Sequence, residues 1–394
     1  MGKNIIVCSD GTGNTFGRSV SNVTRLVKLL ALDNHKEQVV VYDQGIGTTA
    51  RRLRAVTEYR KSVHEKCAFQ ILDGPREWRF KPAGWLTIVL GLLGGWGLKA
   101  NVRQMYCRLS ALYDGPDDKV FLFGFSRGAF TVRALAGLIY RCGLPKTATD
   151  MGERFDKAWK LYKPLQKDDG AVEAFMSNGQ RECPIHFLGL WDTVKSYGGL
   201  FPVMLPHLRH NPRVHIVRHA LALDEHRSWF DATTWGLLDL DSTKKRIKPK
   251  DFEDQDIAEV WFRGCHSDIG GGDVEAVTGM IALRWMLGEA QAVGAKLNDN
   301  GKSVLAADDP LEPEVHESFR GLWWVTEIIP RKEINNFEEF PERTCVYEST
   351  GRRTPDKLTR KGKVLIHPSV GSRHSILVRV EYRPTNRWGL ERFQ

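Results

Sequence analysis

Short apolar runs alternate along this chain with longer segments whose apolar residues recur at helical spacing. The apolar runs predict strands at residues 4–9, 38–43, 118–124, 185–191 and 258–263. The periodic segments predict helices at residues 19–32, 100–113, 127–141, 153–166, 214–223 and 274–290. Strands that are apolar almost throughout, and that alternate with helices, are typical of a mostly parallel sheet covered by helices on both faces. We therefore expect an α/β fold.

The pattern changes after residue 294. Residues 295–362 carry many charges and turn-forming stretches such as Asn298-Asp299-Asn300-Gly301 and Asp308-Asp309-Pro310. These features indicate an irregular elaboration rather than a second large fold. The expected division is a core at residues 1–294 and a C-terminal elaboration at 295–394, packed on the core and returning to it near 364–380.

The most informative motif is Gly124-Phe125-Ser126-Arg127-Gly128, a G-x-S-x-G sequence. It follows a predicted strand and opens a predicted helix, which is the context of a nucleophile elbow. Glycine flanks the serine because the turn is too tight for side chains there. The alternative is an ordinary strand-to-helix turn with an inert serine. We predict that Ser126 is a catalytic nucleophile, with the N–H of Arg127 at the helix start as an oxyanion donor.

A serine nucleophile needs a base and an acid that orients the base, in the chain order Ser, Asp or Glu, His. Asp192 ends the strand at 185–191, which favours it as the acid, although turn and helix-cap roles are common for aspartate. His266 follows the last predicted strand within a glycine-rich stretch and is the favoured base. The competitors are, for the acid, Asp224 and Asp268, and for the base, His186, His219, His367 and His374.

The loop Ser9-Asp10-Gly11-Thr12-Gly13-Asn14 follows the first strand and suits a second oxyanion donor, from the N–H of Gly11 or Thr12. Two other interpretations fit less well. As a dinucleotide fingerprint its third glycine is one residue late, and Asp43 lies about ten residues beyond the expected spacing of roughly 20. As an aspartyl-phosphate loop it has Cys8 at the position of the nucleophile.

Composition narrows the class of protein. The chain has 394 residues, 42% of them hydrophobic and 27% charged, which suits a globular protein with a large core. Its seven cysteines are irregularly spaced without a C-x-x-C, which argues against a disulfide framework or a zinc site. We expect no metal or organic cofactor. The first residues resemble no signal peptide, so we expect synthesis in the cytosol, with signal-independent export left open.

The distribution of charge and one apolar stretch indicate which binding partners to expect. The net charge is +9, and residues 331–394 hold 14 Lys and Arg against 8 Asp and Glu. A second basic cluster lies at 51–61. A solvated basic face explains these charges, and attraction to anionic lipid is the alternative. Residues 85–98 are uncharged but too short to span a bilayer, so we expect a buried or cleft-lining segment, with contact to a lipid surface as the alternative. No nucleic-acid motif is present, and the oligomeric state is not fixed by the sequence.

Several ordered motifs together resemble a known family. The stretches are Ser9–Asn14, Ser21–Leu26, Gly124–Phe130, Gly189–Val194, His219–Glu225, Gly264–Gly272 and Ile366–Val370. They are similar to an uncharacterised α/β-hydrolase domain shared with the first family of type VI secretion lipase effectors. The resemblance implies an α/β-hydrolase fold with the triad Ser126, Asp192 and His266. It also implies phospholipase activity on acyl esters of membrane glycerophospholipids.

The expected function is therefore a serine ester hydrolase, a phospholipase or lipase that works through an acyl-enzyme. Two alternatives remain. The first is an esterase for a soluble or polymeric ester, which would be favoured if residues 85–98 line a closed cleft. The second is a non-catalytic binding module, against which the intact Ser126, Asp192 and His266 argue. The sequence does not show which acyl position is cleaved, or which acyl chain length and head group the substrate has.

Overall fold

The computed structural model describes residues 2–11, 21–44, 69–72, 97–147, 150–162, 169–194, 205–225, 227, 230, 232–235, 255–272 and 277–308. It also describes the short segments 331–334, 343–346, 364–367, 383–384 and 391–393. Predictions on residues 51–61, on nearly all of 85–98, and on Thr12 and His374 lie outside these residues.

A single large sheet organises the described part of the chain. Its strands are β1 (Asn4–Ser9), β2 (Gln38–Asp43), β3 (Phe69–Leu72), β4 (Lys119–Phe125), β7 (Ile185–Trp191), β8 (Val214–Ala222), β9 (Asp256–Phe262), β12 (Val364–Ile366), β13 (Arg383–Pro384) and β14 (Glu391–Phe393). Their order across the sheet is β13-β14-β12-β9-β8-β7-β4-β1-β2-β3. Neighbouring strands are parallel from β12 to β3, and only β13 and β14 add antiparallel pairs at one edge. The α/β prediction is confirmed.

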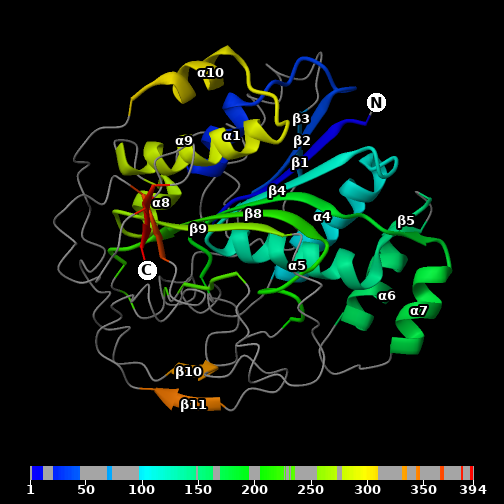
Figure 1. Ribbon diagram of the computed structural model, residues 1–394. Coiled ribbons are helices and arrows are strands. Elements are labelled where there is room, and N and C mark those ends of the chain that lie inside the picture. The colour runs from blue at the N-terminus through cyan, green and yellow to red at the C-terminus, as the bar shows by residue number, and fades with distance from the viewer. Residues whose placement is uncertain are drawn as a thin grey trace, which may run out of the picture.

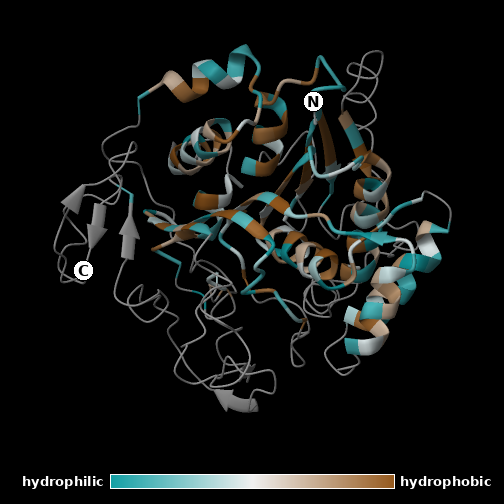
Figure 2. Ribbon diagram, turned by 45° about the vertical axis from the view of Figure 1, so that its right-hand side comes forward, coloured by the Kyte–Doolittle hydropathy of each residue, from teal (hydrophilic) through white to brown (hydrophobic). Residues whose placement is uncertain are grey.

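Helices cover both faces of this sheet (Figure 1). The helices are α1 (Asn22–Leu29), α4 (Leu98–Leu112), α5 (Arg127–Cys142), α6 (Met151–Tyr162), α7 (Asp169–Ser177), α8 (His266–Gly270), α9 (Val277–Ala292) and α10 (Asp299–Ala306). One apolar layer packs α4, α5 and α6 on the sheet, and the other packs α1 and α9. Figure 2 shows the apolar residues gathered along the strands and on the helix sides that meet them. Two small pairs, β5 (Leu144–Pro145) with β6 (Gln180–Arg181) and β10 (Arg331–Ile334) with β11 (Arg343–Val346), stand apart.

Most predicted elements form within a few residues of the expected bounds, but the helix predicted at 214–223 is wrong. That segment is β8, a strand between β7 and β9. Its β-branched residues Val214, Ile216 and Val217 favour a strand. The misleading signal is the polar pair Arg218 and His219, which are buried inside the fold and paired there instead of facing solvent.

The C-terminal region is more regular than predicted in one place. Asn298 does not belong to a loop but caps α10, because its side chain accepts a hydrogen bond from the N–H of Gly301 (2.9 Å). Further along, β12 joins the large sheet beside β9, with Leu365 opposite Val260. The division at residue 294 itself stays a prediction.

Candidate active site

The turn between β4 and α5 holds Ser126 in an unusual backbone conformation. Ser126 has φ 57° and ψ −121°, which L-residues rarely adopt. The flanking glycines explain how the turn closes. A Cβ on Gly124 would lie 2.6 Å from the Cα of Ala129, and one on Gly128 would lie 2.1 Å from the carbonyl oxygen of Ser9. Only glycine fits at either position, as the sequence predicted.

His266 lies within hydrogen-bond distance of both other predicted triad members. Its Nε2 is 2.8 Å from the Oγ of Ser126, and its Nδ1 is 2.6 Å from the Oδ2 of Asp192. The carboxylate accepts a hydrogen bond from Nδ1–H, so Nε2 carries the lone pair that faces the serine hydroxyl. The structure therefore brings Ser126, Asp192 and His266 together, from the ends of β4, β7 and β9.

Asp192 is fixed by backbone contacts. Its N–H donates to the carbonyl of Ala220 (2.8 Å), and its Oδ1 accepts from the N–H of Ala222 (3.0 Å). These bonds hold the residue at φ 39°, a second strained position in the same site. The carboxylate is fully buried, so its charge is oriented toward the imidazole rather than toward water.

The imidazole of His266 is enclosed by aromatic rings. The rings of Phe125 and Phe230 lie 4.8 and 4.9 Å from it, centroid to centroid. Burial lowers the pKa of His266, while the hydrogen bond to Asp192 acts in the opposite direction. A lowered pKa keeps the imidazole neutral near pH 7, the form that can accept a proton.

The predicted competitors have other roles. Asp224 accepts a hydrogen bond from the N–H of Gly264, and Asp268 accepts one from the N–H of Cys265. His219 is buried against Glu259. His186 packs edge-on to Phe121, and His367 stacks on Phe262.

The loop after β1 borders the serine turn, since Gly128 packs against the carbonyls of Ser9 and Asp10. The N–H of Gly11 donates to the carboxylate of Asp10 (2.7 Å). That carboxylate is buried, and it also accepts hydrogen bonds from Ser21, Thr24 and Tyr42. Asp10 is thus an internal anchor of this loop, and Gly11 would have to exchange its bond to serve as an oxyanion donor.

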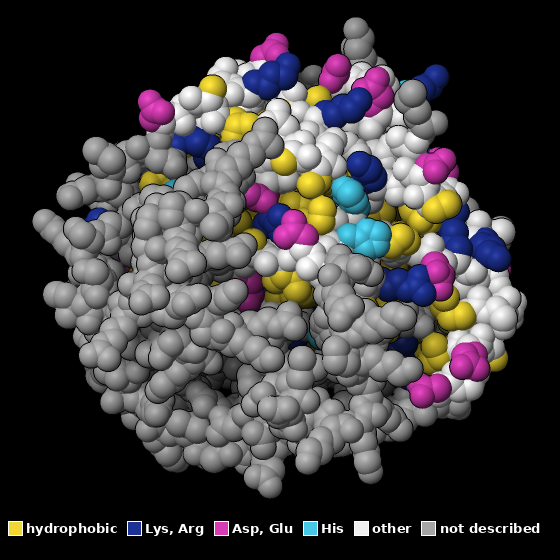
Figure 3. Space-filling view, in the orientation of Figure 1, with side chains coloured by type: hydrophobic (Ala, Val, Ile, Leu, Met, Phe, Trp, Pro, Cys, Tyr) yellow, Lys and Arg dark blue, Asp and Glu magenta, His cyan; other side chains and the backbone are white. Residues whose placement is uncertain are grey.

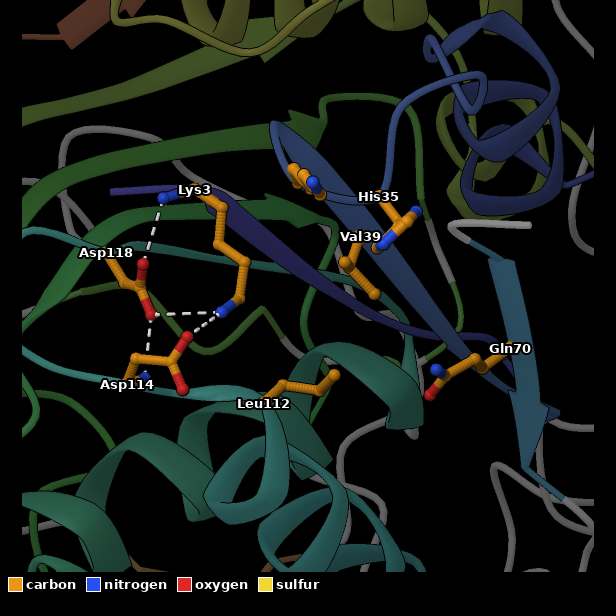
Figure 4. A pocket seen from close by; sticks show the side chains of 8 residues that line it. Lys3, His35, Val39, Gln70, Leu112, Asp114 and Asp118 are labelled. Atoms are coloured by element: carbon orange, nitrogen blue, oxygen red, sulfur yellow. Dashed lines mark hydrogen bonds and ion pairs between the residues drawn. The ribbon is translucent and has the colours of Figure 1, made fainter. Parts of the chain in front are cut away.

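A cavity of about 420 Å³ lies at the opposite end of the sheet, before the amino ends of β1 and β2 (Figure 4). Lys3 lines this cavity and pairs there with Asp114 and Asp118. These charges are satisfied within the protein, and the cavity is separate from Ser126.

The surface charges, the helices and the cysteines of the described residues add no further group to the candidate site. On the face shown in Figure 3, acidic and basic side chains of the described residues are interspersed. Across the residues that the structure describes, no helix is long and apolar enough to cross a bilayer. Nor do three or more His, Cys, Asp or Glu side chains there come together as a metal site. Cys8, Cys107, Cys142, Cys183 and Cys265 are free thiols.

Glu225 is the residue that the sequence reasoning missed. It was noted only within the His219–Glu225 motif, yet its buried carboxylate accepts a hydrogen bond from the N–H of His266 (3.1 Å). A carboxylate shortly after a strand end would have been a usable signal, but the pattern of residues 214–223 predicts a helix there instead of β8.

A parallel α/β sheet with a serine turn between a central strand and a helix defines the α/β-hydrolase class of fold. The family model for the catalytic domain of Tle1-like phospholipase effectors of type VI secretion matches residues 3–289. The chain belongs to this family, which confirms the resemblance of its motifs. Membership supports a hydrolase of the phospholipase or lipase type.

The individual relatives are larger proteins. An uncharacterized protein of Saccharomyces cerevisiae is 32% identical over 241 residues, which are 58% of this chain and 32% of that protein. An uncharacterized protein from Pseudomonas aeruginosa, known from a crystal structure, has a TM-score of 0.40 at 18% identity, over 78% of this chain and 49% of that one. The Tle1 effector bound to the VgrG spike has a TM-score of 0.28 at 18% identity, over 69% and 51%. The chain spans about a third of the yeast relative and about half of the other two.

Proposed function

We propose that this protein is a serine ester hydrolase that cleaves acyl esters of phospholipids through an acyl-enzyme. The observation that carries the proposal is the continuous line of hydrogen bonds from Ser126 through His266 to Asp192. Membership in a family of phospholipase effectors supports the lipid substrate.

In the first half of the reaction, Nε2 of His266 takes the proton of Ser126 as its Oγ attacks the acyl carbonyl carbon. Asp192 accepts a hydrogen bond from Nδ1–H and stabilises the imidazolium that forms. The carbonyl oxygen becomes an oxyanion, which the N–H of Arg127 at the start of α5 would bind. When the intermediate collapses, the leaving alkoxide takes the proton from Nε2, and the acyl group stays on Ser126.

In the second half, Nε2 of His266 takes a proton from water as the water oxygen attacks the acyl carbonyl. Collapse of this second intermediate breaks the ester to Ser126 and returns the proton to its Oγ. The products are a fatty acid and a lysophospholipid. Gly11 and Thr12 are the candidates for the second oxyanion donor, on the loop that Asp10 anchors.

The test is release of fatty acid from phospholipid vesicles, with a short-chain p-nitrophenyl ester assayed beside them. Ser126→Ala should lower kcat by about 10⁶-fold, because His266 and Asp192 contribute to catalysis only together with the serine nucleophile. Ser177→Ala, an exposed serine at the end of α7, is the matched control and should behave as wild type.

Three outcomes separate the candidates. Ser126-dependent release from vesicles supports a phospholipase, and the lyso product identifies the acyl position. Ser126-dependent activity on the soluble ester alone would replace the lipid by another ester. No Ser126-dependent activity on either substrate in a folded protein would contradict the proposal.

A further inference from the structure

The turn after β8 is tied to the turn after β9 immediately around His266. Asp224 exchanges two hydrogen bonds with Gly264, its N–H donating to the carbonyl (3.1 Å) and its Oδ2 accepting from the N–H (2.7 Å). The next residue, Glu225, accepts at its Oε2 a hydrogen bond from the N–H of His266 (3.1 Å), two residues beyond Gly264. The backbone that carries His266 is therefore anchored by neighbouring carboxylates from another strand end.

Glu225 is also paired with Arg227. The Oε1 of Glu225 accepts from the N–H and Nε of Arg227 (2.8 and 2.9 Å), and its Oε2 accepts from Nη2 (2.8 Å). The side chain of Glu225 is fully buried. Burial raises the pKa of Glu225, but the hydrogen bonds and charge of Arg227 outweigh it and lower the pKa to about 2. Glu225 thus carries a negative charge beside His266 throughout the pH range in which histidine titrates.

The pair reaches the imidazole by a second route. The guanidinium of Arg227 lies over the ring of Phe230, 3.8 Å from its centroid. Phe230 in turn meets the His266 ring edge-on at 4.9 Å. A bidentate carboxylate holds a guanidinium in one orientation, so Glu225 also orients the ring that packs against His266.

We propose that Glu225 is a positioning residue for His266: it holds the histidine backbone directly, holds the imidazole through Arg227 and Phe230, and adds its charge to that of Asp192. This inference rests on the proposed function, in which His266 is the base. It assigns the site two carboxylates with different tasks. Asp192 binds the ring of His266, and Glu225 binds its main chain.

The charges facing His266 mean that a positioning role of Glu225 should be visible in the pH dependence of the reaction. They are Asp192 from the end of β7, and Glu225 and Arg227 from the turn after β8. The two carboxylates raise the pKa of His266, and Arg227 lowers it. Removing the charge of Glu225 therefore lowers that pKa, since one supporting anion is lost and Arg227 is left uncompensated. The acid limb of the reaction moves to lower pH, which loosened packing alone would not cause.

The experiment measures how fast a fluorophosphonate probe labels Ser126 between pH 4 and 9 in the full chain, so that no lipid is required. Glu225→Gln should slow labelling by about 100-fold, the usual effect of misplacing a catalytic group by about 1 Å. Its acid limb should lie at lower pH than that of wild type. Glu225→Asp keeps the charge and should keep the limb near its original pH.

Glu289→Gln is the matched control, because Glu289 is another mostly buried carboxylate bonded to an arginine, Arg218 on β8. It should label with the rate and pH profile of wild type. Equal rate and profile in Glu225→Gln would overturn the inference, as would a slowed rate with an unmoved acid limb. Should Glu225→Gln fail to fold, Arg227→Lys removes the bidentate pair, and labelling at the wild-type rate would overturn the inference. A wild-type protein that the probe does not label at Ser126 would contradict the proposed function instead.

Discussion

At the scale of single residues, backbone strain coincides with the candidate chemistry. Four described residues other than glycine have positive φ: Ser126, Asp150, Asp192 and His207. Two of these four belong to the candidate triad. Such conformations cost about 1–3 kcal/mol each and persist only where the surroundings enforce them. The close packing at Gly124 and Gly128, and the backbone bonds of Asp192, provide that enforcement.

Asp192→Asn tests the acid without changing its shape. The asparagine amide can turn its NH₂ toward Nδ1, which favours the wrong tautomer of His266 and leaves no lone pair facing Ser126. We expect kcat to fall by about 10⁴-fold with little change in KM. Asp256→Asn, an exposed aspartate paired with Arg218, should have wild-type kinetics. A kcat for Asp192→Asn within tenfold of wild type would remove Asp192 from the mechanism.

The lowered pKa of His266 predicts the pH dependence of activity. The neutral imidazole is the active form, so activity falls as pH drops through the pKa of His266. Because burial lowers this pKa from its usual value of 6.5, the acid limb of kcat/KM should have its midpoint below pH 6.5. A profile of kcat/KM on a soluble ester checks this. A midpoint above 6.5 would contradict the buried, neutral histidine.

The sequence was sufficient to place Ser126, Asp192 and His266 beside one another. Ser126 and Asp192 directly follow parallel strands, His266 lies in the turn after another, and such strand ends share one edge of the sheet. Glu225 could not be found in the same way. Its role depends on a contact between two turns 41 residues apart in the chain and on the fixed orientation of Arg227. Neither the rotamer of a side chain nor the meeting of two loops leaves a periodic pattern.

At the scale of elements, the serine turn depends on the close approach of α5 to the loop after β1. Gly128→Ala would place a methyl group 2.1 Å from a backbone oxygen that cannot move aside easily. We expect a loss of about 1–3 kcal/mol in the free energy of unfolding, together with slower labelling of Ser126. Gly115→Ala is the control, because a Cβ there meets nothing within 4 Å. Urea denaturation measures both, and equal stabilities would show that the contact is relaxed.

In strand β8 the buried polar pair Arg218 and His219 interrupts the apolar run that would have predicted a strand. His219 makes two buried hydrogen bonds there. Its Nδ1 donates to Glu259 (2.8 Å) and its Nε2 accepts from the N–H of Thr193 (3.2 Å), next to Asp192. Burial lowers the pKa of His219, so the ring is neutral and can make both bonds.

Glutamine can reproduce this donor and acceptor, whereas alanine cannot. We expect His219→Ala to lose about 1–3 kcal/mol of stability for each buried group left unpaired, and His219→Gln to lose less. Thermal or urea unfolding distinguishes them. Equal losses in the two variants would mean that packing, rather than hydrogen bonding, is what His219 supplies.

At the scale of the whole molecule, the alternation of strands and helices predicted the parallel sheet and its two helical layers. The order of the strands could not be predicted in the same way, because it is set by which long-range pairs form. The strands toward the two ends of the sheet, β3 on one side and β12, β14 and β13 on the other, have four residues or fewer. Strands this short carry too few alternating positions to give a pattern.

The two layers meet along the central strand β4, where Phe121 and Leu122 are both fully buried but belong to opposite apolar clusters. Since a parallel sheet is covered on both faces, loosening either layer should weaken the same cooperative unit. We expect Leu122→Ala to cost about 2–5 kcal/mol and Phe121→Ala about 3–5 kcal/mol. Leu112→Ala, at a half-buried leucine at the end of α4, should cost less.

The measurement is urea unfolding followed by tryptophan fluorescence and far-ultraviolet circular dichroism. Buried tryptophans report on both layers, Trp235 in one and Trp191 and Trp285 in the other. If the sheet couples the layers, both probes move to lower urea concentration together in either variant. Separate transitions, with only one layer destabilised by each substitution, would mean that the layers unfold independently. The site of Ser126, Asp192 and His266 would then depend on the stability of only part of the molecule.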